Sequence, residues 1–394
     1  MKISNIQTLH ADGGYRTCSY VKVSTDEGLV GWAEYYDAFS GTSLAPLIEA
    51  HGQMAKGMDP TAYGAVSESL LATTRPAKGG VNHQAVAAIE NACLDIAAKA
   101  ANVPVAKLLG GPFRNSMRLY WTHCGSFRAR HAEAFESWGY QPVRRLDDLE
   151  AIGREVVARG FTAAKTNPLT FGEKPTMANP GFRIAPGFLD RSMTSAQLSL
   201  LREQLFTLRS GCGSEVDLML DVNFSQRTEG GMRIARALED LGLYWLEIDI
   251  HDPEALARIR QSSRTPIASL ESLHGIDEYR PYISGQTVDT VIVDVMWNGV
   301  YQSVKVANLA DAFDTHVAPH NPVGDMGSLM SLHFCAAVPN ARIMEYRPDE
   351  APWTKQFLTH PLDIAHGHIT LPDRPGWGAD INEEALAPYL ITRA

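Results

Sequence analysis

The sequence predicts an α/β fold whose main part is a parallel (β/α)8 barrel. Beyond residue 115, short apolar segments alternate with longer amphipathic segments of helical periodicity. The apolar segments number eight: MRLYW, FTAAK, DLMLD, YWLE, PIASLE, DTVIVD, THVAPH and ARIMEY. Polar or charged residues stand at the end of every one of them. Eight strands separated by helix-length sequence favour a closed barrel over an open sheet.

The first 115 residues have a different pattern, which predicts an α+β unit ahead of the barrel. The segment YVKVSTDEGLVGWAE contains two alternating strands around the turn signal Asp26-Glu27-Gly28, as in a hairpin. The Ala-rich segment HQAVAAIENACLDIAAKAA has helical spacing, and Val103-Pro104 follows its end.

Length and composition narrow the class of protein. A chain of 394 residues with 45% hydrophobic residues can bury a large core in two domains. The net charge of −10, without a basic run, argues against nucleic acid and membrane surfaces as partners. The sequence shows neither an apolar signal peptide nor a stretch of ~20 apolar residues, so we expect a cytoplasmic protein. Five scattered cysteines suggest neither a disulfide framework nor a zinc site.

The polar residues at the strand ends predict where the functional site lies. In a barrel the C-terminal ends of the strands surround one mouth, so residues far apart in sequence meet there. The residues concerned are Thr122, His123, Lys165, Asn167, Asp221, Asn223, Glu247, Glu271, Asp294, His320 and Glu345. The segment LMLDVNFS is an example, because its buried strand runs directly into a carboxylate that needs a partner.

Three of these residues predict a metal site. Asp221, Glu247 and Glu271 end consecutive strands, and three carboxylates side by side repel one another unless a cation lies among them. Oxygen ligands favour a hard divalent ion, and few protein ligands favour Mg²⁺ over Ca²⁺. The alternative, in which each acid caps a helix or pairs with an arginine, is favoured for any one acid alone. Three acids at the ends of consecutive strands favour a metal site over that alternative.

His320 and Asp294 end neighbouring strands and predict a general base. An aspartate beside a histidine fixes its tautomer and stabilises the imidazolium. A lone histidine in APH would more often cap a helix or pack in the core. With the neighbouring Asp294 and a metal site across the mouth, a catalytic role for His320 is favoured. Lys165 would supply a positive group across the pocket; taken alone, it would be interpreted as a solvated loop lysine.

With these residues in place, the chain resembles the enolase superfamily and, within it, the mandelate racemase-like subgroup. The motifs GFTAAKTN, LMLDVN, WLEID, PIASLES, VDVMWNG, VAPH and IMEY follow the family's barrel in order. VKVSTDEGLVGWAE resembles the start of its α+β capping domain, and GHITLPDRPGWGADI resembles the C-terminal segment that returns to that domain. The resemblance implies a capping domain over 1–115, a barrel over 116–359 and the returning segment over 360–394.

The resemblance also implies roles for the site residues. The three strand-end acids would bind one Mg²⁺ per active site, and the ion would hold the carboxylate of an α-hydroxy acid. Asp294 and His320 would form the base dyad, and Glu345 would donate a hydrogen bond to a substrate carboxylate oxygen. The ion, Lys165 and Glu345 would stabilise the enediolate that forms when the α-proton leaves.

Two departures from the family pattern bear on the reaction. Racemases of the subgroup carry Lys-x-Lys after the second strand, whereas this chain has KTN, with Asn167 replacing the second base. An amide cannot take a proton. We therefore expect a hydro-lyase that dehydrates an aldonate or aldarate to a 2-keto-3-deoxy acid. One alternative is a racemase, epimerase or cycloisomerase. The other is a non-catalytic binding protein. The second departure is LEID in place of Glu-Glu-Pro, which introduces Ile248 and Asp249.

Four further residues are candidates for substrate contact: Arg16, His123, Asn167 and Asn223. Arg16 lies in HADGGYRTC and could bind a distal hydroxyl or carboxylate, or be a surface arginine. His123 could act as a second acid, hydrogen-bond the substrate or pack under a loop. The Pro- and Gly-rich loop 168–190 should cover the mouth, with Lys174 or Arg183 reaching the substrate. The expected partners are an acid sugar and further copies of the chain in a homo-oligomer.

Overall fold

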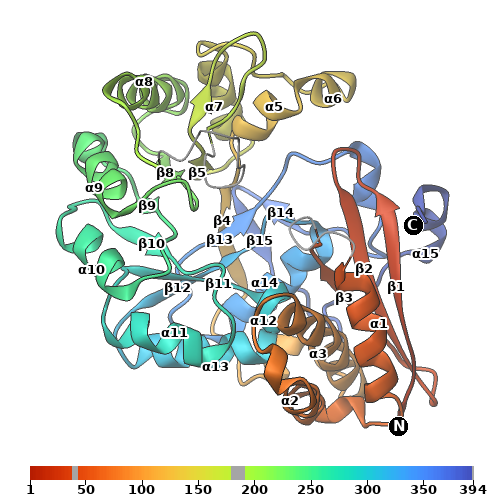
Figure 1. The fold of residues 1–394 in the computed structure, drawn as a ribbon. Helices are drawn as coiled ribbons and strands as arrows, with labels where there is room; N and C mark the ends of the chain where they lie inside the picture. Colours follow the sequence, from red (N-terminus) through yellow and green to blue (C-terminus); the bar gives the residue numbers. More distant parts are fainter. Residues whose placement is uncertain (38–42, 179–190, 393–394) are drawn as a thin grey trace.

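The computed structural model describes residues 1–37, 43–178 and 191–392. The N-terminal unit consists of an antiparallel sheet in the order β1-β2-β3 with helices packed against it (Figure 1). Its elements are β1 (Ile3–Asp12), β2 (Thr17–Thr25), β3 (Val30–Tyr35), α1 (Leu44–Ala55), α2 (Tyr63–Thr73), α3 (Gly80–Ala100) and α4 (Val105–Leu108). The predicted hairpin and Ala-rich helix are therefore present as β2-β3 and α3.

The eight predicted apolar segments all form strands, and these lie parallel in sequence order around the barrel. They are β4 (Ser116–Trp121), β5 (Ala163–Thr166), β8 (Asp217–Asp221), β9 (Trp245–Glu247), β10 (Ile267–Ser269), β11 (Thr290–Asp294), β12 (His316–His320) and β13 (Met344–Tyr346). β13 pairs with β4. The ring is completed between β12 and the residues before β13, where the Arg342 N–H donates to Val317 O and the Val317 N–H donates to Asn340 O.

The helices that connect the strands lie outside the barrel (Figure 1). They are α5 (Ser126–Arg130), α6 (Ala132–Ser137), α7 (Asp148–Ala158), α8 (Ser195–Cys212), α9 (Thr228–Ala237), α10 (Pro253–Gln261), α11 (Gly275–Ser284), α12 (Val295–Asn298), α13 (Val300–Asp311) and α14 (Asp325–Ala337). Local sequence fixes some of their starts. Thr194 and Gln197 form a capping box at α8, and Asp252 caps α10 with Pro253 at its first position.

A ring of buried side chains, one from each strand or its immediate start, fills the interior of the barrel. These residues are Tyr120, Ala163, Met219, Trp245, Ala268, Ile292, Ala318 and Ile343. Large and small residues share the layer, so the barrel is a packed core and not a pore.

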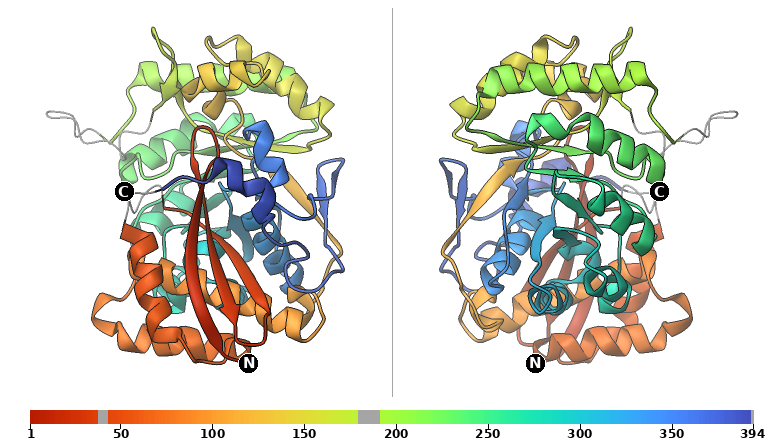
Figure 2. Two further views of the ribbon diagram at one scale, coloured as in Figure 1. Left: turned by 90° about the vertical axis from the view of Figure 1, so that its right-hand side faces the viewer. Right: turned by 90° about the vertical axis from the view of Figure 1, so that its left-hand side faces the viewer.

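The C-terminal segment contacts both units. The hairpin of β14 (Ile364–Ala365) and β15 (His368–Thr370) pairs antiparallel with β4 of the barrel through β15. Buried Trp377 then donates from Nε1 to Trp32 O of the N-terminal unit. Further on, α15 (Glu383–Leu386) lies near β1, where the Ile391 N–H donates to His10 O (Figure 2). The pairing with β4 was not predicted from the sequence; the domain boundaries stay predictions.

Two smaller findings bear on the class of protein. All five cysteines are buried and unpaired. None of the helices within the described ranges is both long and apolar enough to cross a membrane.

Close packing of β3 on α3 depends on Gly31. A Cβ there would lie 2.0 Å from Ala92 O and 2.7 Å from Ile96 Cγ1. Gly31→Ala should therefore force the sheet away from the helix and lower the free energy of unfolding by about 1–3 kcal/mol. Gly172→Ala is the matched control, because nothing lies within 4 Å of its Cβ position. Urea unfolding measures both, and equal stability of the two variants would contradict this packing.

Candidate active site

A buried lysine lies at the centre of the predicted site. Lys165, on β5, has 2% of its side chain exposed. Its Nζ is 2.8 Å from Glu247 Oε2, 3.2 Å from Glu345 Oε1 and 3.8 Å from Asp221 Oδ2. Burial alone would lower the pKa of Lys165, but these carboxylates raise it well above its usual value, so the ammonium is retained. The structure thus brings four of the predicted residues together.

The acids at the strand ends are buried and only partly paired. Glu247 Oε1 and Glu271 Oε2 accept no hydrogen bond within the described part of the chain. Burial and mutual repulsion raise the pKa of both groups, and that of Asp221 in the same way. Carboxylate oxygens that accept no hydrogen bond in a dry site are costly unless a cation or a donor reaches them.

Asp249 adds a fourth carboxylate that the sequence analysis did not assign to the site. Its exposure is 2%; Oδ1 accepts from Ser269 Oγ and the Leu270 N–H, while Oδ2 accepts nothing from the described residues. Burial and the charge of Glu247 raise its pKa to about 6. Asp249 lies two residues beyond Glu247, the last residue of β9, and this position next to a strand-end acid was the signal in the sequence.

These oxygens fit a hard divalent cation. Carboxylate oxygens without protein donors are the ligand type that Mg²⁺ prefers. As the side chains stand, no three or more His, Cys, Asp or Glu residues within 1–37, 43–178 and 191–392 are arranged to hold a metal ion. Lys165 occupies the position between Glu247 and Asp221, so binding of an ion there requires that side chain to turn away.

Asn223 orients Asp221 and does not project freely toward a ligand. Its backbone N–H donates to Asp221 Oδ1 at 2.7 Å and its Nδ2 donates to Oδ2 at 2.9 Å. Asn223 has a φ of 47°, a left-handed conformation that asparagine tolerates better than most residues. Its position in the site was predicted from the sequence, but its direct contacts are with the acid.

His320 and Asp294 form a hydrogen-bonded pair. His320 Nδ1 lies 2.7 Å from Asp294 Oδ2, while Oδ1 of that aspartate accepts from the Met296 and Trp297 N–H groups at the start of α12. Nε2 of the histidine is 3.4 Å from Glu271 Oε2. Burial would lower the pKa of His320, but Glu271 and Asp294 outweigh it and raise the pKa to about 10. Asp294 therefore fixes the ring orientation, and in the neutral imidazole it would keep the remaining proton on Nδ1.

Glu345 is surrounded by donors. Thr122 Oγ1 donates to its Oε1 at 2.5 Å, and the Asn321 N–H donates to its Oε2 at 2.6 Å. Although burial opposes ionisation, Lys165 and His320 together with these bonds lower the pKa of Glu345 to about 2. In this arrangement Glu345 accepts hydrogen bonds, whereas the resemblance implied that it donates one.

Asn167 and His123 support each other. Asn167 Oδ1 accepts from His123 Nδ1 at 2.8 Å and from Ser126 Oγ at 2.9 Å, and its Nδ2 donates to Asp221 O at 3.1 Å. The His123 ring stacks on Phe127, with centroids 3.8 Å apart. Burial lowers the pKa of His123 to about 3. Its Nδ1 carries the proton, so neutral His123 presents Nε2 as an acceptor only.

Arg16 makes ion pairs within the protein, and its contact with a substrate stays a prediction. Arg16 lies between the two units, with Nη1 3.3 Å from Glu34 Oε1 and Nη2 3.3 Å from Glu350 Oε1. Only 7% of its side chain is exposed. The arginine is held by buried acids from both units, because an unpaired charge there would be costly.

The loop after the second barrel strand begins as a short hairpin of β6 (Leu169–Thr170) and β7 (Thr176–Met177). Lys174 is 88% exposed and lies 3.7 Å from Glu133, so it pairs at the surface. Arg183 falls outside the described residues.

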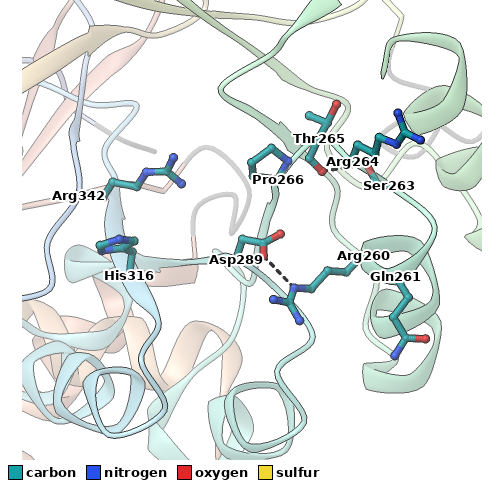
Figure 3. A pocket seen from close by; sticks show the side chains of 9 residues that line it. All are labelled: Arg260, Gln261, Ser263, Arg264, Thr265, Pro266, Asp289, His316 and Arg342. Atoms are coloured by element: carbon teal, nitrogen blue, oxygen red, sulfur yellow. Dashed lines mark hydrogen bonds and ion pairs between the residues drawn. The ribbon is translucent and has the colours of Figure 1, made fainter. Parts of the chain in front are cut away.

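A cavity of about 520 Å³ lies at the other end of the barrel and contains none of the predicted site residues (Figure 3). Asp289, His316 and Arg342 line it from the beginnings of strands or the residues before them. Its arginines have protein partners: Arg260 pairs with Asp289, and Arg342 donates to the Tyr244 hydroxyl and Thr290 Oγ1. These contacts give it a structural role.

Comparisons with known proteins agree with this fold. Residues 7–110 match the mandelate racemase/muconate lactonizing enzyme N-terminal domain, and residues 148–385 match the enolase C-terminal domain-like family. The chain belongs to the mandelate racemase/muconate lactonizing enzyme family of the enolase superfamily.

Relatives within this family carry several names. A solved structure of a candidate L-alanine-DL-glutamate epimerase from Burkholderia xenovorans strain LB400, bound to magnesium and fumarate, is 40% identical; the match covers 98% of this chain and 96% of that one, with a TM-score of 0.94. D-xylonate dehydratase from Haloferax volcanii is 27% identical over 99% of this chain and 89% of its own. A D-galactonate dehydratase family member from Streptomyces bingchenggensis is 28% identical, and the match covers 94% of this chain and 89% of that protein.

Asn167 should be a structural anchor of the mouth. Asn167→Ala leaves the buried Ser126 hydroxyl and Asp221 carbonyl without this partner, so we expect the free energy of unfolding to fall by about 1–3 kcal/mol. Asn5→Ala, at an exposed strand position, should change it by less than about 0.5 kcal/mol. Guanidinium titration measures both changes. An Asn167→Ala protein as stable as the wild type would show that these bonds are dispensable.

Proposed function

We propose that this protein dehydrates an acid sugar to a 2-keto-3-deoxy acid with the help of Mg²⁺. The observation that carries the proposal is a single oriented base: His320 is oriented by Asp294, whereas Asn167 stands where a second base would be and is held by three hydrogen bonds. Relatives named as dehydratases of D-xylonate and D-gluconate support the same reaction class.

Asp221, Glu247 and Glu271 would hold the ion, and the free Oδ2 of Asp249 adds a fourth candidate oxygen. When bound, Mg²⁺ supplies Lewis-acid stabilisation of the negative charge that develops on the substrate carboxylate. Asn223 keeps Asp221 in a fixed orientation through two hydrogen bonds. The magnesium in the Burkholderia xenovorans relative supports this cofactor assignment.

His320 would perform the proton transfers. Its Nε2 takes the proton from the α-carbon, and the resulting imidazolium is stabilised by Asp294. The bond between the β-carbon and its hydroxyl then breaks, and the same imidazolium returns its proton to the departing hydroxide as water. The enol that remains tautomerises to the 2-keto acid. This syn route is favoured because neutral His123 has no proton on Nε2 to donate.

The base must be neutral before it can accept a proton. Glu271 is the largest of the causes that raise the pKa of His320. A cation bound to Glu271 would neutralise that charge and return the imidazole toward its neutral form.

Lys165 would stabilise the enediolate as charge develops. Its ammonium lies in a dry site, where a charge–charge interaction is stronger than in water. Glu345 would keep Lys165 and the Asn321 backbone in position, and could donate a hydrogen bond to the substrate only after taking up a proton.

Epimerisation is the second candidate, and the name of the 40% identical relative is the observation that favours it. Epimerisation needs proton donors and acceptors on both faces of a planar intermediate. Lys165 is the other ionisable group available for that role. Its ion pair with Glu345 opposes proton loss, which is why dehydration is preferred.

A screen of aldonic and aldaric acids tests the reaction. With Mg²⁺, the wild-type protein should form 2-keto acids detectable with semicarbazide, and His320→Asn should lower kcat by at least about 10³-fold because the base is lost. Proton NMR in D₂O detects inversion at the α-carbon. Inversion at the α-carbon without keto acid would show that the protein is an epimerase and not a dehydratase. A fully active His320→Asn protein would show that His320 is not the base.

Calorimetric titration with Mg²⁺ tests the metal ligands. Glu247→Gln and Glu271→Gln should each weaken binding about tenfold or more, because each removes one charged ligand. Asp249→Asn distinguishes a ligand from a bystander: a comparable loss would make it a fourth ligand. Asp240→Asn, at an exposed position, is the control. Unchanged Mg²⁺ affinity in Glu247→Gln would exclude that residue from the site.

A further inference from the structure

Glu34 of the N-terminal unit contacts the first turn of a barrel helix. It lies on β3, its side chain is inaccessible to solvent, and α14 packs against that strand. Oε1 accepts from the Gly324 N–H at 3.0 Å, and Oε2 accepts from the Gly327 N–H at 2.9 Å. One carboxylate therefore caps α14 with both of its oxygens, although it belongs to the other unit of the fold.

Further hydrogen bonds continue from this contact to Glu345. Gly324 O accepts from Ser328 Oγ at 3.0 Å, and the same hydroxyl oxygen accepts from Asn321 Nδ2 at 3.0 Å. The Asn321 N–H donates to Glu345 Oε2 at 2.6 Å. Ser328, Asn321 and Glu345 are each 0% exposed, so a broken bond there leaves a polar group that water cannot satisfy. We call Glu34, Gly324, Ser328, Asn321 and Glu345 the Glu34 network.

The network joins the two units of the fold at the barrel mouth. Glu34 belongs to the N-terminal sheet, whereas Glu345 lies on β13 with Oε1 3.2 Å from Lys165 Nζ. The segment 321–324 connects them, because Glu345 holds its first residue and Glu34 holds its last. The N-terminal unit thus has a continuous buried connection to a group at the mouth.

Gly324 makes this contact a tight one. Its φ of −81° and ψ of −168° are also accessible to alanine, so a side chain would not strain the backbone. A Cβ there would nevertheless lie 2.7 Å from Arg16 Nη2 and 2.8 Å from Glu34 Oε1. Gly324→Ala should therefore disturb the network from the barrel side, through contact alone.

We propose that Glu34 is a positioning residue that, through this network, sets where the Glu345 carboxylate lies beside Lys165. Without the Glu34 carboxylate, the Gly324 N–H loses its acceptor and the segment that begins at Asn321 can shift. Glu345 then loses a fixed donor, and a misplacement of about 1 Å can lower a rate about 100-fold. The inference rests on the proposed function for the roles of Glu345 and Lys165.

Variants on both sides of the contact test the network. Glu34→Gln keeps the side-chain volume but turns an amide NH₂ group toward one of the two N–H groups, and Gly324→Ala disturbs the same contact from α14. Asp95→Asn is the matched control. Asp95 is an equally buried acid that accepts from the Trp32 and Trp377 N–H groups, and it lies outside the network. Thermal melting checks the folding of each variant.

With Mg²⁺ and the best acid from the substrate screen, Glu34→Gln and Gly324→Ala should each lower kcat about tenfold or more. KM should change by less than about threefold, because the network does not include the acids proposed to hold the ion. Glu34→Asp, which retains the charge, should recover part of the rate. Asp95→Asn should lower the melting temperature and change kcat by less than about twofold. Unchanged kcat in Glu34→Gln, or an equal loss in Asp95→Asn, would overturn the proposal.

A double-mutant cycle separates positioning from a general loss of packing. If Glu34 acts through Ser328, the variant that combines Glu34→Gln with Ser328→Ala should be about as slow as the slower single variant. Additive losses in kcat would show that the two residues act independently and would overturn the network. If Glu34→Gln does not fold, Gly324→Ala replaces it in the cycle.

Crystal structures of the variants give a readout that does not require turnover. In Glu34→Gln and in Ser328→Ala, the distance from the Asn321 N–H nitrogen to Glu345 Oε2 should exceed about 3.5 Å, the limit of a hydrogen bond. In Asp95→Asn it should stay as in the wild type. An unchanged distance in the first two variants would overturn the positioning role. Absence of turnover of every acid by the wild type, with the expected displacement present, would reject the dehydratase and keep the network.

Discussion

The arrangement of the barrel mouth depends on one buried ammonium group. Lys165 is nearly inaccessible to solvent, yet its Nζ contacts the carboxylates of Glu247 and Glu345 within 3.2 Å. Without it, the acids at the mouth would repel one another in a dry environment, which proteins rarely tolerate. Their hydrogen-bond donors are few, and Glu247 Oε1 and Glu271 Oε2 have none within the described ranges. The ammonium and a divalent cation are therefore alternative ways of balancing the same negative charge.

The N-terminal unit contributes to the site through the loop that follows His320. Glu34 of β3 accepts from the Gly324 and Gly327 N–H groups at the start of α14, which begins directly after that loop. A carboxylate at a helix N-terminus is favourable because the N–H groups there are unpaired and the helix dipole is positive. Arg16 then balances Glu34 and Glu350 together. The end of the loop that follows the predicted base is thus held by contacts between the two units.

Sequence patterns predicted the barrel well because its physics is local and periodic. Each strand is a short apolar run whose C-terminal end opens on the mouth, so Asp221, Glu247 and His320 could be placed at the mouth from their positions alone. Side-chain pairing over long sequence distances could not be assigned in this way. Arg16 pairs with Glu350, 334 residues away, and no local pattern distinguishes that partner from a substrate. The position of Asp249 in the cluster of acids was missed although the residue follows the end of β9 directly, two residues after Glu247.

The two sides of the predicted pocket differ in their capacity to move protons, and this difference limits the chemistry. On one side, Asp294 fixes His320 so that Nε2 faces the acids. On the other, Asn167 binds His123 Nδ1, and the pKa of that buried ring falls to about 3. An amide and a neutral imidazole acceptor cannot deliver a proton to an intermediate, whereas a charged imidazolium can. This asymmetry supports the proposed reaction, in which the proton and the hydroxide would leave on the same face and Lys165 would act as a charge without exchanging its proton.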